Sequence, residues 1–201
     1  MTVSVIFFKT VYNIRSSEEQ KLTKVLGSRE TFLEADKETS MEFLRDVSDI
    51  VQIEEYDRLK EYTHHRSTTR YQHCLNVAWY SFLWAKGMGL DAKSAARGGM
   101  LHDFYLYDSN EDYFKKMGVS HIALHPKIAL QNAEKYLVLN ETEKDCILNH
   151  MWPLGDRKPE TKEGYVVCMA DKYCASLEWG HGKAEKIVPI VKEIFESLDE
   201  N

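Results

Sequence analysis

Proline is confined to the second part of this chain, where all four prolines lie at position 126 or later. Proline interrupts helices because it lacks a backbone N–H and its ring clashes with the preceding turn. Nothing of this kind stops helices over the first 125 residues. Alternating apolar and polar residues are nearly absent, and residues 2–8 are the one candidate strand. The sequence therefore predicts an all-α fold.

Capping signals and apolar periodicity indicate where the helices lie. Ser16 with Glu19, and Thr39 with Glu42, have the capping-box spacing ahead of apolar stretches. We expect helices near residues 17–26, 40–62, 68–87, 91–103, 126–137, 141–151, 162–178 and 183–198. Residues 1–40 are interpreted as a short N-terminal appendage of unknown role, and residues 41–201 as one compact helical domain.

Composition restricts the partners of the chain. Its hydrophobic fraction of 43% and charged fraction of 29% are typical of globular proteins. No apolar run reaches the length of a membrane span and the start does not resemble a signal peptide, so we expect a cytoplasmic protein without a membrane partner. The net charge of −6 argues against general nucleic-acid binding, which requires a basic surface. The four cysteines form no C-x-x-C pair and are predicted to be reduced, buried thiols.

A His-Asp pair ends an apolar helical run in the sequence GGMLHDFY at residues 98–105. Burying a carboxylate without a partner is far more costly than burying a neutral polar group, so Asp103 requires compensation. Gly98 and Gly99 precede the pair by about one helical turn. They would let a neighbouring helix approach closely.

Other histidines and a second aspartate occupy comparable positions. His73 lies on an apolar helical stripe. His125 precedes Pro126, which places this histidine at the start of a helix, and His150 ends another apolar helix. Asp171 lies on an apolar face that offers no cation of its own.

Taken singly, each of these residues would more often be structural, as a hydrogen-bonded core histidine, a helix cap or half of an ion pair. Taken together, four imidazoles and two carboxylates have a divalent metal ion as their best common partner. Metal charge would compensate the buried Asp103. The candidate ligands are His73, His102, Asp103, His125, His150 and Asp171.

The ordered pattern H…HD…H…H…D resembles that of the HD superfamily of metal-dependent phosphohydrolases, over roughly residues 65–180. RYQH places Arg70 three residues before the first histidine, LHDF carries the central pair, and HPKIA is similar to the H-P-x-I-G/A stretch of dinuclear members. The chain lacks the H-D-I-G-K continuation and the G-Y-P element of the cyclic-di-GMP phosphodiesterases. It looks more like uncharacterised bacterial HD hydrolases of the dinuclear type.

The resemblance implies a compact helical bundle that binds one or two divalent ions, with iron or manganese favoured and nickel, zinc or magnesium open. The first ion would take His73, His102, Asp103 and Asp171, and the second His125 and His150, with Asp103 bridging. His121 is the rival of His125. A metal-bridging hydroxide would attack phosphorus, and Arg70 and Lys172 would bind phosphoryl oxygens.

The expected reaction is hydrolysis of a small anionic phosphomonoester or phosphoanhydride, with a nucleotide favoured. HD-scaffold di-iron oxygenases and non-catalytic HD signalling or binding modules are the alternatives. The sequence leaves open whether the chain forms a homodimer.

Further residues near the candidate ligands have commonplace interpretations. Arg157 and Lys158 follow His150 in a loop and could contact a distal phosphate, although a solvated charged turn is the commoner role. Trp152 could stack on a base, although packing at the rim of the core is commoner. The remaining histidines are interpreted as solvent or loop residues, namely His64, His65 and His181.

Overall fold

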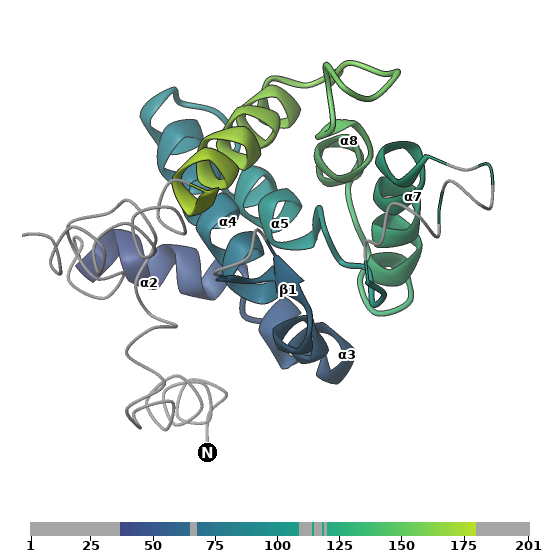
Figure 1. Cartoon of the computed structure of the whole chain (residues 1–201). Helices are drawn as coiled ribbons and strands as arrows, with labels where there is room; N and C mark the ends of the chain where they lie inside the picture. The colour runs from purple at the N-terminus through teal and green to yellow at the C-terminus, as the bar shows by residue number, and fades with distance from the viewer. Residues whose placement is uncertain (1–36, 65–67, 109–113, 115–117, 119, 180–201) are drawn as a thin grey trace, which may run out of the picture.

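The described part of the chain is a bundle of α-helices with one small hairpin (Figure 1). The computed structural model describes residues 37–64, 68–108, 114, 118 and 120–179. In order, its elements are α2 (Lys37–Asp46), η2 (Ile50–Gln52), α3 (Glu54–Asp57), η3 (Arg58–Glu61), β1 (Thr63–His64), β2 (Thr68–Thr69), α4 (Arg70–Gly87), α5 (Ala92–Leu101), α7 (His121–Glu134) and α8 (Glu141–Asn149). A further helix covers residues 162–179. The all-α prediction is confirmed, and β1 pairs antiparallel with β2.

Several predictions concern residues outside the described ranges. The expected helices at 17–26 and 183–198 and the candidate strand at 2–8 lie there. The appendage was expected to end at residue 40, whereas α2 already begins at Lys37.

The segment predicted as one helix over residues 40–62 is divided into four short helical pieces, so this prediction is wrong. The Asp49 side chain accepts a hydrogen bond from Ile50 N at 3.1 Å and caps a new 3-10 helix, because short acidic side chains compete for backbone N–H groups. Ile53 then has extended backbone before α3. Each piece buries an apolar residue, including Ile50 and Tyr56, so packing on the core fixes these breaks.

α7 begins at His121, five residues before the expected start at 126. Ser120 is the extended N-cap residue, and its carbonyl accepts the first hydrogen bonds of the helix at 3.1 and 3.2 Å. Pro126 therefore lies inside the helix, where it removes one backbone hydrogen bond. The prediction that His125 lies at the start of a helix is wrong. His121 and His125 instead lie one turn apart on the same face.

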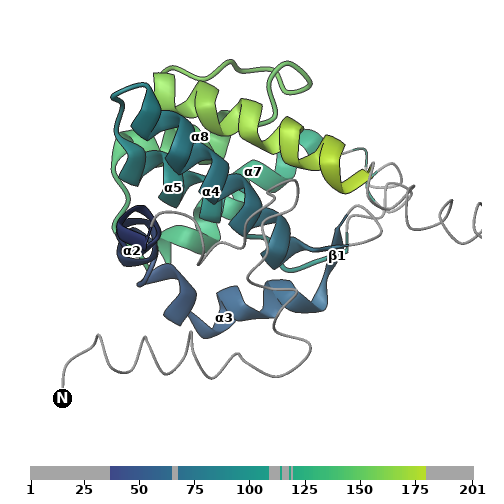
Figure 2. The same cartoon turned by 90° about the vertical axis from the view of Figure 1, so that its left-hand side faces the viewer.

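Two glycines let three helices meet closely around the end of α5 (Figure 2). A Cβ at Gly99 would lie 2.7 Å from Ala78 Cα of α4 and 2.9 Å from Ala78 N. A Cβ at Gly98 would overlap the Cys146 side chain of α8. The predicted close approach is confirmed on both sides of α5. It places the His-Asp pair that follows α5 between α4 and α8.

The apolar interior also agrees with the sequence. The four cysteines are buried free thiols, as predicted. One buried cluster joins α4 to the 162–179 helix through residues that include Val77, Val167 and Ala170. Among the described helices, none has both the length and the hydrophobicity that crossing a bilayer requires.

Asp145 of α8 fixes the loop that leads into the 162–179 helix. Its carboxylate accepts hydrogen bonds from the backbone N of Glu160 at 3.0 Å and of Thr161 at 2.8 Å, and from Asn149 Nδ2 at 2.7 Å. Burial raises the pKa of Asp145, but these hydrogen bonds, with that of the Thr161 hydroxyl foremost, bring the pKa below its usual value. The anchor sets the position of the helix that carries Asp171.

We expect Gly99→Ala to lower the free energy of unfolding by about 1–3 kcal/mol, because the added Cβ overlaps backbone atoms of Ala78. Gly87→Ala is the matched control, since a Cβ there meets nothing within 4 Å and alanine favours the helix. Urea denaturation measures both variants. A Gly99→Ala protein as stable as the wild type would contradict the close packing of α4 on α5.

We expect Asp145→Asn to lower the free energy of unfolding at pH 7 by about 1–3 kcal/mol, because the ionised acceptor of several buried hydrogen bonds is lost. The pKa in the folded state lies below the unfolded value of about 3.9. The carboxylate therefore stabilises the wild type fully above that value and loses this contribution as the pH falls through the folded pKa. Urea denaturation at pH 7 and at about pH 3, which lies below the unfolded pKa, should show a smaller difference in the free energy of unfolding between the two proteins at the lower pH. A difference that is the same at both pH values would exclude this role of Asp145.

Candidate metal centre

All six predicted ligands come together where α4, α5, α7, α8 and the 162–179 helix meet. They are His73 from α4, His102 and Asp103 directly after α5, His125 from α7, His150 at the end of α8, and Asp171 from the 162–179 helix. Five of them are buried to 5% exposure or less, and the Asp171 side chain is 14% exposed. Elements far apart in the sequence thus supply one cluster of imidazoles and carboxylates.

Asp103 lies between the histidines. Its Oδ1 is 3.3 Å from His125 Nε2 and 3.7 Å from His150 Nε2, and its Oδ2 is 3.8 Å from His102 Nε2. The Nε2 atoms of His125 and His150 are 3.0 Å apart. Asp103 thus contacts ligands of both predicted groups, as a bridging carboxylate must.

Asp171 joins the other side of the cluster. Its Oδ1 lies 3.1 Å from His73 Nε2 and 3.8 Å from His102 Nε2. The ligand atoms of His73, His102 and Asp171 lie within 4.8 Å of one another. A second such set consists of His102, Asp103 and His150.

Backbone carbonyls orient three of the four imidazoles. The Nδ1 atoms of His102, His125 and His150 each lie 2.8 Å from a carbonyl oxygen three or four residues earlier in the chain. A carbonyl oxygen only accepts, so Nδ1 carries the proton and Nε2 presents a lone pair. The three Nε2 atoms are the ones that lie near Asp103, and this is the arrangement of metal-binding histidines.

Two buried polar atoms of the cluster, His102 Nε2 and Asp103 Oδ1, have no hydrogen bond among the described residues. Around Asp103, lone pairs of imidazole nitrogens face a carboxylate oxygen, so acceptors face an acceptor. A bound cation would satisfy them together. Neutral imidazoles and carboxylates are a donor set that suits iron, manganese, nickel or zinc. These residues therefore fit one or two divalent ions.

The protonation of the cluster agrees with metal binding. Burial lowers the pKa of His150 to about 3 and also lowers the pKa of His102, so both imidazoles are neutral near pH 7. Burial raises the pKa of Asp103, but the positive charge that the surrounding histidines carry when protonated, with His102 foremost, holds that pKa well below its usual value. A neutral imidazole beside an ionised carboxylate is the form in which both bind metal.

His73 differs from the other three histidines. Burial lowers its pKa, but the neighbouring carboxylates of Glu178 and Asp171 outweigh burial and raise the pKa to about 10. The position of His73 between two carboxylates favours its positively charged form. The same two carboxylates would stabilise the charge of a metal ion bound beside His73.

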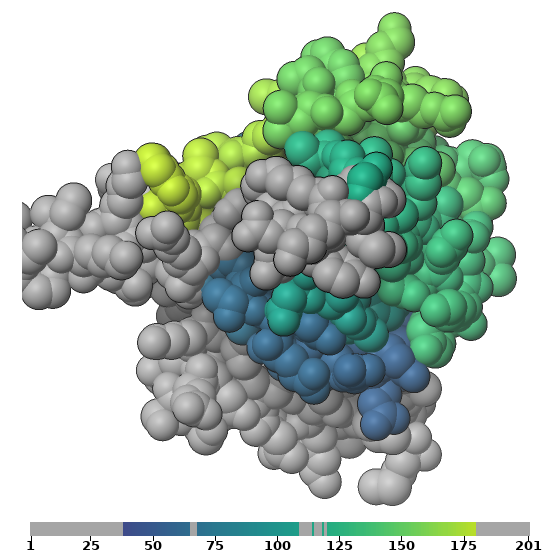
Figure 3. Space-filling model, turned by 45° about the vertical axis from the view of Figure 1, so that its right-hand side comes forward, coloured from purple at the N-terminus to yellow at the C-terminus, as the bar shows by residue number. Residues whose placement is uncertain are grey.

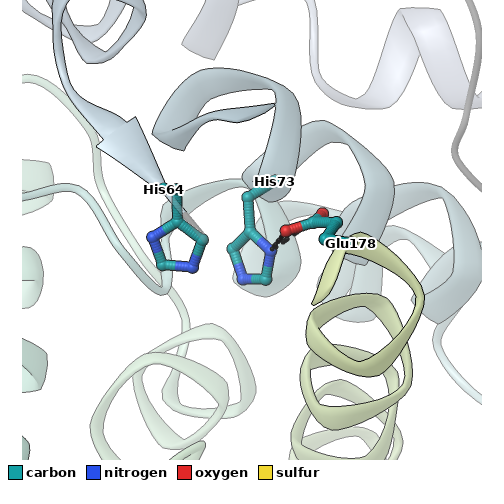
Figure 4. A group of neighbouring side chains, drawn as sticks. All are labelled: His64, His73 and Glu178. Carbon is teal, nitrogen blue, oxygen red and sulfur yellow. Dashed lines mark hydrogen bonds and ion pairs between the residues drawn. The ribbon is translucent and has the colours of Figure 1, made fainter. Parts of the chain in front are cut away.

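Sequence reasoning missed Glu178, a fully buried residue whose two carboxylate oxygens lie 3.0 and 3.1 Å from His73 Nδ1 (Figure 4). It follows Asp171 by seven residues, which is two helical turns, so both carboxylates share one face of their helix. That spacing was the signal that could have located it.

His64 is also closer to the cluster than predicted. It belongs to β1 and is half-buried, and its ring centroid lies 4.1 Å from that of His73 at an interplanar angle of 33°. The interpretation of His64 as a solvent or loop residue is therefore wrong, because the short hairpin turns it toward α4. His65 and His181 lie outside the described residues.

His121, the rival of His125, lies beside the cluster. Its ring stacks on that of His125 with centroids 4.6 Å apart, and its Nδ1 is 3.3 Å from the hydroxyl oxygen of Tyr107. The backbone carbonyl of His121 is the acceptor for His125 Nδ1. His121 thus orients His125, while the Nε2 of His125 is the atom beside Asp103.

Arg70 is 1% exposed and its guanidinium is engaged by the backbone. Nη1 and Nη2 donate to the carbonyl oxygens of Tyr105 at 2.7 Å and Tyr107 at 3.2 Å, and the guanidinium carbon lies 3.6 Å from the centroid of the Tyr105 ring. These contacts hold the segment after the His-Asp pair against α4. The predicted contact of Arg70 with a phosphoryl oxygen stays a prediction.

Lys172 lies at the edge of the cluster. Its Nζ donates to the carbonyl oxygen of His150 at 2.7 Å and lies 3.4 Å from Asp171 Oδ2. The Lys172 side chain is 32% exposed, so its ammonium group lies between the candidate ligands and solvent.

The loop after His150 lies at the surface (Figure 3). Arg157 and Lys158 are exposed there. A cavity of about 410 Å³ beside α7 and α8 is lined by residues that include Trp152, Arg157 and Lys127. Direct sequence neighbours of His125 and His150 also line it.

Comparison with known proteins gives one family and a set of relatives. Residues 70–176 match the model of the HD domain. Ribonuclease Y of Mycoplasma capricolum subsp. capricolum is 30% identical over 166 residues, which cover 83% of this chain and 29% of that protein. Ribonuclease Y of Aquifex aeolicus is 33% identical over 129 residues, which cover 60% of this chain and 21% of that protein. The chain thus spans less than a third of the length of these relatives, and no solved structure gives a significant match.

We expect protein purified without a metal-affinity column to carry one or two divalent ions per chain, and Asp103→Ala to lose most of them because the shared carboxylate is removed. Prolonged chelation should lower the melting temperature of the wild type, since a ligand that binds only the folded state stabilises it. Mass spectrometry of metal content and thermal unfolding measure the two effects. Asp156→Ala, in the exposed loop, is the control and should retain the metal. A wild type that holds no ion, even after reconstitution with iron or manganese, would contradict the metal centre.

Proposed function

Because this chain belongs to the HD-domain family, we propose that it is a metal-dependent phosphohydrolase that cleaves a phosphomonoester or phosphoanhydride of a nucleotide. The observation that carries this proposal is the buried cluster, in which Asp103 Oδ1 and His102 Nε2 have no hydrogen bond among the described residues. The relatives at 30–33% identity bear the name Ribonuclease Y, and cleavage of RNA is a reaction at phosphorus, which supports this proposal.

We propose that the cluster holds two ions and that Asp103 would be a ligand of both. We assign one ion to His73, His102, Asp103 and Asp171, and the second to Asp103, His125 and His150. Bound divalent ions lower the pKa of water toward neutrality and withdraw charge from phosphoryl oxygens. The histidines supply neutral donors in a fixed orientation, and the two carboxylates supply the charge that holds the ions.

We assign phosphate binding to Lys172, which stands beside both Asp171 and the end of α8. Lysine suits this role as a compact charge on a flexible stem, able to reach a phosphoryl oxygen while one hydrogen bond holds it near the site. The contacts of Arg70 favour a structural role, because its Nη atoms already donate to two backbone carbonyls.

A nucleotide suits the surroundings of the cluster. The cavity beside α7 and α8 combines an aromatic ring, Trp152, with the cations Lys127 and Arg157. An aromatic face can stack on a base, and the cations can bind a further phosphate. We therefore propose that the base and distal phosphates lie toward this loop.

A phosphodiester in a short RNA is the second candidate substrate. It is favoured by the name Ribonuclease Y that these relatives carry. The net charge of −6 favours a small ligand or a strand end over an extended duplex, because long nucleic acids are held by basic surfaces.

The test is a screen of the protein reconstituted with Mn²⁺ or Fe²⁺. Phosphate release from nucleoside mono-, di- and triphosphates is compared with shortening of end-labelled oligoribonucleotides. Hydrolysis that Asp103→Ala abolishes supports the proposal, and the substrate that reacts decides between nucleotide and RNA. Turnover that requires oxygen would instead indicate an oxygenase, and no turnover with loaded metal would indicate a binding module.

We expect Lys172→Ala to lower kcat/KM by about 100-fold, because one charge that stabilises the phosphoryl oxygens is removed. Lys144→Ala is the control, since Lys144 lies on α8 and pairs with Glu134 and Glu141. Steady-state kinetics on the best substrate of the screen measure both variants. Equal kcat/KM for Lys172→Ala and the wild type would contradict the assigned role of Lys172 in phosphate binding.

A further inference from the structure

His73 is held by a carboxylate at each of its two ring nitrogens. Asp171 Oδ1 lies 3.1 Å from Nε2, and the oxygens of Glu178 lie 3.0 and 3.1 Å from Nδ1 (Figure 4). His73 and Glu178 are both fully buried. Because the two nitrogens of an imidazole point in diverging directions, Glu178 lies on the side of His73 that faces away from Asp171.

The carboxylate of Glu178 is itself fixed from α4. Asn76 Nδ2 donates to Glu178 Oε1 at 3.0 Å, and Gln72 Nε2 donates to Asn76 Oδ1 at 2.8 Å. Asn76 is fully buried, and it lies one turn after His73 on the same helix. α4 therefore provides both the imidazole and part of the frame that holds its carboxylate partner.

This arrangement distinguishes His73 from the other candidate ligands. His102, His125 and His150 each donate from Nδ1 to a neutral backbone carbonyl, whereas the partner of His73 Nδ1 is a carboxylate. An ionised acceptor withdraws the Nδ1 proton more strongly and makes Nε2 a better donor to metal. Glu178 also lies outside residues 70–176, the part of the chain that matches the HD domain.

We propose that Glu178 is a positioning residue of the metal centre: it accepts the Nδ1–H of His73, directs Nε2 toward Asp171 and His102, and strengthens His73 as a ligand. This inference rests on the proposed function, because it requires an ion at Nε2. It adds that the ion held by His73 binds more tightly than its direct ligands alone would allow. The imidazole and its carboxylate act together as one ligand.

The alternative interpretation is that His64, His73 and Glu178 themselves bind an ion, since their ligand atoms lie within 4.8 Å of one another. Such an ion would take Nδ1 of His73. Nε2 could then bind the main centre only if His73 lost both ring protons, which a neutral imidazole resists. The ring of His64 also lies over the ring of His73 with a tilt of 33°. The geometry favours the hydrogen bond from Nδ1 to Glu178.

The test compares Glu178→Gln with Glu143→Gln. Glu143 is the matched control, because it is also a buried glutamate, 4% exposed, but its partner is Arg97 at 2.6 Å and not a histidine of the cluster. The affinity for Zn²⁺ is measured by competition with a chromophoric chelator on the full chain. We expect Glu178→Gln to weaken the binding of one Zn²⁺ ion by about 10- to 100-fold, the usual loss when the partner of a ligating histidine is removed. Glu143→Gln should lose folding stability and keep the wild-type affinity.

A folded Glu178→Gln protein with unchanged Zn²⁺ affinity would overturn this inference while leaving the proposed function intact. A wild type that binds no Zn²⁺, Mn²⁺ or Fe²⁺ would overturn both. Equal loss of affinity in the two variants would also overturn the inference, because it would show a general effect of burying an amide.

If Glu178→Gln does not fold, a measurement on the wild type loaded with Zn²⁺ tests the same inference. A ¹H–¹⁵N correlation spectrum of the histidine rings should show His73 with a proton on Nδ1 and zinc on Nε2. Zinc on Nδ1 would overturn the inference in favour of the ion held by His64, His73 and Glu178.

Discussion

The burial of Asp103 among imidazole nitrogens is the constraint on which the rest of this structure depends. Its Oδ1 has no hydrogen bond among the described residues and faces the Nε2 atoms of His125 and His150 at 3.3 and 3.7 Å. A carboxylate in such a place is tolerable only when positive charge accompanies it. Two buried guanidinium groups of the bundle contact other partners: Arg97 pairs with Glu143 and Asp49, and the Nη atoms of Arg70 donate to backbone carbonyls. Metal binding is therefore the consistent account of this buried charge.

The helices meet in the way that this site requires. Small residues at positions 98 and 99 remove the side chains that would separate α5 from α8 and α4, so the residues that follow α5 enter the centre of the bundle. Carbonyl groups of α5, α7 and α8 then orient the rings of His102, His125 and His150. The backbone thus selects the tautomer without any further polar side chain. His73 lies within α4, and its acceptor is the buried Glu178 from another helix.

Much of the fold and of the site followed from local sequence patterns. The helical class rests on the placement of proline and the near absence of alternating patterns, and the close approach at Gly98 and Gly99 rests on two adjacent residues. Each candidate ligand was located by its place on an apolar face or at a helix end, and the order of the six resembles that of the HD superfamily. The exceptions have physical causes. The segment 40–62 breaks where Asp49 competes for a backbone N–H and where apolar residues turn into the core. α7 tolerates Pro126 in its interior, so the usual position of proline misplaced the start of the helix.

The sequence by itself determined which residue types were available: imidazoles and carboxylates on apolar faces, in an order that resembles the HD superfamily. Only the tertiary structure decided which atoms meet. It brought Glu178 to His73 Nδ1, laid His64 against the ring of His73, and directed Arg70 to Tyr105 and Tyr107. These contacts join residues 9 to 105 positions apart, and most of them depend on how whole helices pack. A periodic pattern fixes the face on which a side chain lies, whereas its partner is fixed by the distance and angle between helices, which no single segment encodes.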